Sequence, residues 1–346
     1  MPLRIVLLLL SALLAACATV AAPVGVGAYD SRAEVRAFAD DVASRRGWDA
    51  AWVLQQLHDA RLKPLSQKLM MPAPPGQAKN WNAYRDRFVE PQRVAAGVAF
   101  WQANADALAR AEARFGVPAE VIVGIVGVET YYGRVMGSFR ALDALATLAF
   151  DFPAGRSDRS AYFRDELEEL LLLARKETVA PASLIGSFAG AIGLPQFMPG
   201  SINRFAIDFD ADGHIDLTAS AADAIGSIAN FLAMHGWQRG MPATFEATPP
   251  EDRIERAKLL APDIVPSFDA AAMAAAGATL SPAGRAHSGL LALVRVDNGD
   301  DPPSYVAGTA NFFALTRYNR SSYYARAVLA LGEAVQRALP GAPAGR

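Results

Sequence analysis

Apolar and polar positions follow the period of a helix along most of the chain. Between residues 32 and 338, apolar side chains recur at intervals of three and four positions, which places them on one face of a helix. Strand patterns are few: residues 294–296 are one candidate, and residues 300–313 read as irregular. The pattern therefore predicts a mainly α protein without internal repeats. The expected helices cover residues 32–46, 50–62, 91–115, 118–129, 140–150, 160–176, 183–191, 199–207, 221–235 and 321–338.

Residues that favour helix ends mark several of these boundaries. Ser31 precedes the first helix and Glu34 follows three positions later, which is the spacing of a capping box. Gly116 is expected at the left-handed position that ends the long helix before it, and Pro118 opens the next helix. Residues 118–129 are apolar nearly all round, which predicts a helix buried in the core.

Glu129 is a lone carboxylate at the end of this buried helix. Gly124 and Gly127 leave room for another backbone to approach it closely. Burial in apolar surroundings disfavours the charged form of a carboxyl, so its pKa rises. An acid that stays protonated near neutral pH can donate a proton to a leaving group. Glu129 is therefore a candidate catalytic acid, and the alternatives are a structural ion pair or a side chain that reaches solvent at the helix end.

The loop over residues 208–216 reads Asp-Phe-Asp-Ala-Asp-Gly-His-Ile-Asp. Carboxylates at loop positions 1, 3 and 5, with glycine at 6, match the first half of an EF-hand. Three carboxylates this close repel one another without a cation, which disfavours a plain Asp/Gly turn. Position 12 is Ala219, where a calcium EF-hand places a glutamate. We expect a structural Ca²⁺ held by Asp208, Asp210, Asp212 and the backbone carbonyl of His214, and Asp223 a few residues on could serve as a further ligand if the loop is lengthened.

Residues 187–199 form a third cluster, rich in small residues and containing two prolines. Gln196 is a polar side chain among apolar neighbours there, and such a side chain is usually hydrogen-bonded. Its amide offers both a donor and an acceptor to a sugar ring or an N-acetyl group. The alternative is that Gln196 satisfies a backbone group of its own loop.

The first residues indicate export. Arg4 supplies a positive start, and residues 5–14 are an apolar run too short for a permanent membrane span, as in a signal peptide. The run ends in Leu-Ala-Ala before Cys17, which resembles a bacterial lipobox and implies cleavage before Cys17 and lipidation of that cysteine. The alternative is an ordinary signal peptide with an incidental cysteine. Residues 1–16 are thus expected to be the signal, and residues 17–30 the lipidated cysteine with a short tether.

Composition narrows the class. The chain has 346 residues, 52% of them hydrophobic and 20% charged, which suits a globular protein with a substantial core. The formal net charge is −2 and no basic run occurs, so nucleic acid is not an expected partner. Cys17 is the single cysteine, so no disulfide can form within the chain. Residues 241–290, rich in Ala, Pro and charge, read as a more variable lobe.

Several motifs in order resemble the membrane-bound lytic murein transglycosylases of the B type, a lipoprotein family. The resemblance extends from about residue 31 to 338, in one unit expected over residues 31–340. It implies a lysozyme-like catalytic core over about residues 85–235, with additional helical lobes and the calcium loop at 208–223. The motifs are residues 127–130, 133–137, 190–199, 208–216, 223–227, 235–237 and 316–319.

The resemblance also implies a reaction. Glu129 matches the family's single acid/base, which would protonate the glycosidic oxygen between N-acetylmuramic acid and N-acetylglucosamine. The same carboxylate would then deprotonate the muramoyl 6-hydroxyl, giving a 1,6-anhydromuramoyl end. A missing second carboxylate fits substrate assistance by the N-acetyl oxygen. Two alternatives are a hydrolytic muramidase on the same groove and a non-catalytic scaffold that binds peptidoglycan.

The family resemblance also implies roles for other single positions of this sequence. Phe231 stands where the family pattern has tyrosine, so a hydroxyl contact to the glycan would be lost while ring stacking could remain. Arg156 or Arg159 is a candidate contact to a substrate carboxylate, whereas the tryptophans 81, 101 and 237 are expected in the core. The remaining substrate-binding candidates are Tyr84, Ser187, Gln196, Tyr318 and Asn319.

The expected partners follow from the same resemblance. They are peptidoglycan strands, the outer membrane through the lipid anchor, and possible cell-wall synthesis or remodelling proteins. Ala18 follows Cys17, which by the lipoprotein pattern favours the outer membrane, facing the periplasm. We expect a monomer that uses no organic cofactor.

Overall fold

The computed structural model describes residues 29–72 and 79–341. The predicted signal peptide, Cys17 and nearly all of the tether lie outside these described residues. Within them, no helix combines the length and the apolar character needed to cross a membrane. The described chain is mainly helical, as the sequence pattern predicts.

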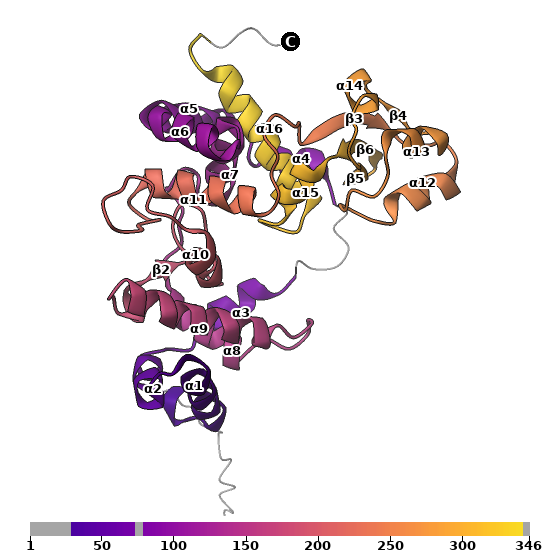
Figure 1. The fold of residues 1–346 in the computed structure, drawn as a ribbon. Helices are drawn as coiled ribbons and strands as arrows, with labels where there is room; N and C mark the ends of the chain where they lie inside the picture. Colours follow the sequence, from indigo (N-terminus) through magenta and orange to yellow (C-terminus); the bar gives the residue numbers. More distant parts are fainter. Residues whose placement is uncertain (1–28, 73–78, 342–346) are drawn as a thin grey trace, which may run out of the picture.

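One end of the molecule is a helical lobe around α8 (Ala141–Phe150) and α9 (Ser160–Lys176), which pack against each other (Figure 1). All but one residue of α8 are buried, in keeping with a helix in which Asp143 and Thr147 are the polar residues. The other elements of this lobe are η1 (Tyr29–Ser31), α1 (Ala33–Arg46), α2 (Ala50–His58), α3 (Pro64–Met70), η2 (Pro181–Ser183) and α10 (Pro199–Phe205).

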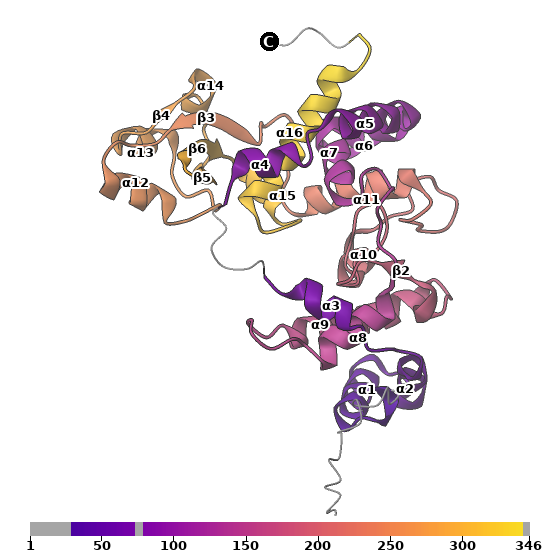
Figure 2. The ribbon, with the colours of Figure 1, turned by 180° about the vertical axis from the view of Figure 1, so that it is seen from behind.

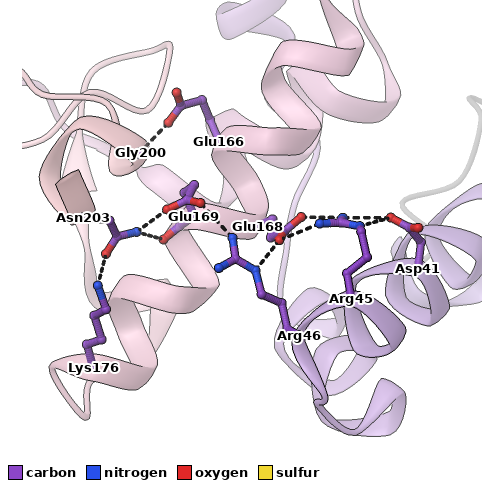
Figure 3. A network of polar contacts seen from close by, with 9 residues as sticks. All are labelled: Asp41, Arg45, Arg46, Glu166, Glu168, Glu169, Lys176, Gly200 and Asn203. Atoms are coloured by element: carbon purple, nitrogen blue, oxygen red, sulfur yellow. Dashed lines mark hydrogen bonds and ion pairs between the residues drawn. The ribbon is translucent and has the colours of Figure 1, made fainter.

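Charged side chains join α1 to α9 and α9 to α10 (Figure 3). Glu168 is buried and accepts hydrogen bonds from Arg45, at 2.6 and 2.9 Å, and from Arg46, at 2.5 Å. Arg46 also donates to Glu169, whose carboxylate accepts from Asn203 of α10 at 2.8 and 2.7 Å respectively. A buried carboxylate with two guanidinium donors fixes the relative position of these helices better than apolar contact alone, because the bonds are directional.

The core of the molecule is built on α7 (Ala119–Thr130) and α16 (Ser322–Ala338), which pack side by side. A Cβ added at Gly124 would lie 2.3 Å from the carbonyl oxygen of Val328, so only glycine permits this approach. Figure 2 shows α4 (Trp81–Asp86) lying across the N-terminal part of α16. Three more helices enclose α7: α5 (Pro91–Ala103), α6 (Ala105–Phe115) and α11 (Ala221–Met234).

A small α+β lobe extends from one side of this core (Figure 1). Its antiparallel sheet has the strand order β4-β3-β6-β5, and it covers an apolar cluster of its own that includes Phe245, Met273 and Leu293. The strands are β3 (Thr244–Thr248), β4 (Thr279–Leu280), β5 (Ala292–Asn298) and β6 (Asp301–Gly308), and the helices are α12 (Arg253–Leu260), α13 (Ala270–Ala275) and α14 (Pro282–Arg285). Helix α15 (Ala310–Thr316) leads back to α16.

The secondary structure predicted for three stretches of the chain is wrong. Residues 91–115 form two helices, because the chain leaves the helical conformation at Asn104, whose side-chain amide bonds the carbonyl of Phe100. Residues 183–191 contain the end of η2, the short strand β2 (Ile185–Gly186) and a turn, and β2 pairs with β1 (Phe139–Arg140). Residues 300–313 contain β6 and the start of α15, although they read as irregular.

The first helix boundary also differs from the prediction. Its N-cap is Arg32, one residue after Ser31, and the Arg32 side chain makes no capping hydrogen bond. Arg32 instead donates to Asp151 at the end of α8, at 2.8 Å. This tertiary ion pair attaches the start of α1 to the end of α8. By contrast, Gly116 does end α6 in the left-handed conformation (φ 74°), as expected.

Candidate active site

Glu129 is the penultimate residue of α7, where the helix leaves the core. Tyr131 then adopts the left-handed conformation (φ 52°, ψ 47°) and ends the helix. The Glu129 side chain is partly buried, and the hydroxyl of Tyr324 in α16 donates to its Oε1 at 2.6 Å. The close approach of α16 at Gly124, slightly more than one turn earlier, brings this tyrosine to the carboxylate.

This environment keeps Glu129 protonated at higher pH than an ordinary glutamate. Burial raises the pKa of Glu129 to about 7, although the hydrogen bond from Tyr324 acts in the opposite direction by stabilising the carboxylate. No second carboxylate among the described residues is a cause of this shift. A carboxyl with a pKa near neutrality can both give and take a proton.

Three tyrosines surround Glu129. Burial raises the pKa of Tyr84, Tyr318 and Tyr324, and the nearby charge of Glu129 raises each of them further. All three phenols therefore stay protonated and can act as hydrogen-bond donors. Tyr84 and Tyr318 are two of the residues predicted beside the acid, so the structure brings these together.

Tyr324 was not predicted. The sequence gives a helix over residues 321–338, and Tyr324, Val328 and Leu331 recur on one face of it. That spacing marks Tyr324 as a core position. Pairing that face with Gly124 and Gly127 of α7 would have placed Tyr324 near Glu129, but the pairing of two distant helices is not visible in the periodicity of either.

The loop over residues 187–197 is attached beside the C-terminal end of α7. Thr130 Oγ1 donates to the carbonyl of Leu194 at 3.2 Å, and Tyr318 Oη donates to the carbonyl of Pro195 at 2.5 Å. Ser187 Oγ accepts from the amides of Ala189 and Ala191, at 3.3 and 3.1 Å. Ser187 thus has an ordered oxygen, and its own hydrogen is available to another acceptor.

Gln196 holds its own loop together. Its side-chain Nε2 donates to the carbonyls of Met136 and Gly193, at 3.2 and 3.0 Å, while its backbone has a positive φ of 48°. Both side-chain amide hydrogens of Gln196 are therefore used by backbone carbonyls, as the second interpretation of this residue predicts. The carbonyl oxygen of Gln196 is the part that a substrate could use.

Phe231 and Asn319 differ in their exposure to solvent: Phe231 is buried and Asn319 is exposed. The ring of Phe231 is only 5% exposed and packs against Phe197, Phe205 and Tyr318, with ring centroids 5.0 to 5.4 Å apart. It therefore supports the wall behind Tyr318. Asn319 is exposed at the end of the same wall.

The calcium loop brings three of its five predicted ligands together. One carboxylate oxygen from each of Asp208, Asp210 and Asp212 lies within 4.8 Å of the others. Oxygen-only donors at this spacing suit a hard cation. Asp223 is 1% exposed and accepts instead from the backbone amides of Phe209, Asp210 and Asp216, so it supports the loop from behind.

The remaining candidates have structural contacts. Arg156 donates to the carbonyl of Met70, and the guanidinium of Arg159 lies 4.7 Å from the ring centre of Tyr162. Trp81 and Trp237 are 5% and 8% exposed, as expected for core residues, and Trp101 packs against the main core.

The chain matches the family model of the transglycosylase SLT domain over residues 30–333. It belongs to this family. The curated membrane-bound lytic murein transglycosylase B of Escherichia coli K12 is 40% identical over 318 residues, which cover 89% of this chain and 84% of the relative. The protein is therefore a lytic transglycosylase that acts on peptidoglycan.

Two solved structures extend the comparison. The Escherichia coli lytic transglycosylase Slt35, in complex with calcium, superposes with a TM-score of 0.75 at 40% identity, over 90% of this chain and 95% of that one. SltB3 of Pseudomonas aeruginosa, in complex with NAG-anhNAM-pentapeptide, gives a TM-score of 0.74 at 28% identity, over 89% and 82%. These transglycosylases share a lysozyme-like fold, so the predicted mainly α, lysozyme-like class is confirmed, whereas the EF-hand form of the calcium loop stays a prediction.

Proposed function

We propose that Glu129 is the single acid and base of this lytic transglycosylase. The observation that carries the proposal is a partly buried carboxyl with a pKa of about 7. Tyr324 donates a hydrogen bond to it, and no second carboxylate contributes to the shift in its pKa. The protonated carboxyl gives its proton to the glycosidic oxygen as the bond from that oxygen to C1 of N-acetylmuramic acid breaks. The N-acetylglucosamine then leaves with a free 4-hydroxyl.

The second half of the reaction returns the proton. The N-acetyl oxygen of the substrate stabilises the cationic C1, as in substrate-assisted glycosidases. The Glu129 carboxylate removes the proton of the muramoyl 6-hydroxyl while its oxygen bonds C1, which gives the 1,6-anhydro ring and consumes no water. Tyr324 acts as a positioning residue here, because its hydroxyl donates to the carboxylate formed between the two halves.

The loop and the tyrosine wall supply the binding groove in this proposal. Tyr84 and Tyr318 lie around the acid, and Ser187 has a hydroxyl hydrogen to donate. Gln196 offers its carbonyl oxygen, and Asn319 an exposed amide. Binding to the N-acetyl and hydroxyl groups of the glycan is the chemistry that these groups fit.

The test is mass spectrometry of fragments released from purified peptidoglycan, beside the variant Glu129→Gln. We expect anhydromuramoyl products, one water lighter than hydrolytic ones, and loss of nearly all release in the variant. Products with reducing ends would make the enzyme a muramidase. Equal release by the variant would remove Glu129 from the mechanism, and no release by either protein would favour the scaffold alternative.

We also propose that the aspartate loop binds Ca²⁺ as a structural ion. The three converging carboxylates of Asp208, Asp210 and Asp212 support this, as does the calcium complex of the relative Slt35. The loop lies on the surface and the catalytic steps above need no metal, so the ion would stabilise the fold.

We propose further that Cys17 is lipidated and anchors the enzyme to the outer membrane. The lipobox-like residues before it and the membrane-bound relative support the anchor. Replacing Cys17 by alanine should move the protein from the membrane fraction to the soluble fraction. Retention of that variant in the membrane would contradict the proposal.

A further inference from the structure

A pocket of about 230 Å³ lies between the start of α7, the end of that helix away from Glu129, and the middle of α16. Its walls are the first turn of α7, the middle of α16 and the segment over residues 237–244 that leads into β3. Glu120 in this pocket precedes Glu129 by nine positions, or about 13 Å along the helix axis. The pocket is therefore separate from the catalytic site.

The size of the pocket suits one side chain. Sites for whole small molecules usually measure about 300 to 1,000 Å³, whereas a cavity of about 150 Å³ holds a benzene ring. The floor is apolar and rigid: Trp237 is 8% exposed and its Nε1 donates to the carbonyl of Gly116 at 3.0 Å. Pro118, Met241 and Leu329 complete the apolar lining.

The polar part of the lining is acidic. Glu120 and Glu333 both line the pocket, and burial raises the pKa of Glu120, followed by the charges of Glu112 and Glu333. Among the described residues, Glu120 has no cation within 4.0 Å; its one side-chain donor is Gln336, at 3.4 Å.

The basic residues nearby do not neutralise both pocket carboxylates. Arg337 is 3.6 Å from Glu333, in a pair whose two side chains are 61% exposed, so it screens that carboxylate only weakly. Arg239 donates to the carbonyls of Glu112 and Ala113, at 3.0 and 2.7 Å. The pocket therefore presents two carboxyl groups above an apolar floor, and only Glu333 has a basic neighbour within 4.0 Å among the described residues.

We propose that this pocket binds a lysine or arginine side chain of a partner protein. The aliphatic stem of such a side chain fits the floor of Trp237, Met241 and Leu329, and its charged end reaches Glu120 and Glu333. A cation there also relieves the repulsion between the two carboxylates, so charge complementarity selects a basic residue over an apolar one of similar size. Arginine is among the residues enriched at the energetic centres of protein interfaces.

The experiment uses the full chain with ¹³C-labelled methionine methyl groups. The probe is the capped tripeptide acetyl-Ala-Arg-Ala-amide, and its neutral control contains citrulline in place of arginine. We expect a saturable shift of the Met241 resonance, which Met241→Leu identifies by its absence. The citrulline peptide should bind at least tenfold more weakly.

Variants of the carboxylates provide the second arm. The double variant Glu120→Gln and Glu333→Gln should weaken arginine-peptide binding at least tenfold, whereas the matched surface variant Glu251→Gln should not change it. Equal binding of the citrulline peptide, binding that survives in the double variant, or no shift at Met241 would each overturn the proposal. Thermal unfolding of all variants reports whether the fold is intact, and an unfolded double variant is replaced by the two single ones.

Discussion

The raised pKa of Glu129 predicts that the catalytic acid destabilises its own protein at alkaline pH. Ionised Glu129 is desolvated in the folded state, and Tyr324 offsets only part of that loss. In the unfolded chain the same carboxyl is in water and ionises at its ordinary pKa. Replacing Glu129 by glutamine removes the charge while the amide oxygen can still accept from Tyr324. The variant should therefore gain stability relative to the wild type as the pH rises.

The magnitude follows from the two pKa values. A pKa that rises from 4.5 to about 7 on folding corresponds to about 3 kcal/mol, at roughly 1.4 kcal/mol per pKa unit. Because the folded state holds the proton more tightly, the stability is greatest below the unfolded pKa and falls as the pH rises through the folded pKa. Integration between pH 5 and pH 8 gives a loss of about 2.5 kcal/mol for the wild type and none for this site in the variant.

The assay is urea unfolding of the wild type, Glu129→Gln and the control Glu251→Gln at pH 5, 6, 7 and 8. The difference in unfolding free energy between Glu129→Gln and the wild type should grow by about 2.5 kcal/mol over this range, or about 4 °C in Tm for a chain of this size. Glu251 is exposed before α12, so its variant should follow the wild type throughout. A difference for Glu129→Gln that stays constant from pH 5 to pH 8 would refute the buried-acid reasoning.

Three further predictions concern activity, calcium and the inter-helix charge network. Tyr324→Phe removes the hydrogen-bond donor to Glu129 and should raise the pKa of that carboxyl, so the alkaline limb of the pH profile of kcat/KM moves to higher pH and kcat falls about tenfold. An alkaline limb at the same pH in the variant would argue against the hydrogen bond between Tyr324 and Glu129. EDTA should lower the Tm of the wild type but not of Asp210→Asn, and equal Tm values with and without EDTA would count against a bound Ca²⁺. Burial raises the pKa of Glu168, but the bonds from Arg45 and Arg46 outweigh it and hold that pKa below its usual value, so Glu168→Gln should cost about 1–2 kcal/mol at pH 7. This stabilisation is present above pH 4.5 and is lost as the pH falls through the lowered folded pKa, so a cost that persists in acid would contradict it.

The helices were predictable where packing agrees with local pattern. Gly116 ends α6 as its sequence position indicates, and α9 has the bounds that its periodicity gives. The errors arise where a contact distant in sequence decides the conformation. Residues 183–191 are small and apolar enough for a helix, but the chain turns back on itself there. The carbonyl oxygen of Ala191 comes so close to Gly186 that a Cβ added at residue 186 would lie 2.1 Å from it. Strand β6 pairs with β3 and β5, and no local pattern reports such partners.

The candidate site was predictable to a similar degree. Glu129 stands out as a charge at the end of an apolar helix, and the structure shows it partly buried. Asp223 carries the right chemistry for a ligand, but its position at the start of α11 turns it toward the backbone amides of the loop. Sequence gives the residue type at each position, whereas the direction of a side chain depends on which elements pack together.

The last described helix, α16, keeps Glu129 protonated near neutral pH. Helix α7 alone would leave this carboxyl at a solvent-exposed helix end, where a glutamate ionises normally and cannot act as an acid at neutral pH. α16 covers it, and this contact depends on Gly124, because a side chain there would meet the Val328 carbonyl. Packing between two helices that are about 190 residues apart in sequence therefore sets both the pKa of Glu129 and the position of its donor, Tyr324. A substitution such as Gly124→Ala, which would push α16 away by a few tenths of an ångström or more, should weaken activity and lower the pKa of Glu129 together, although residue 124 touches no substrate.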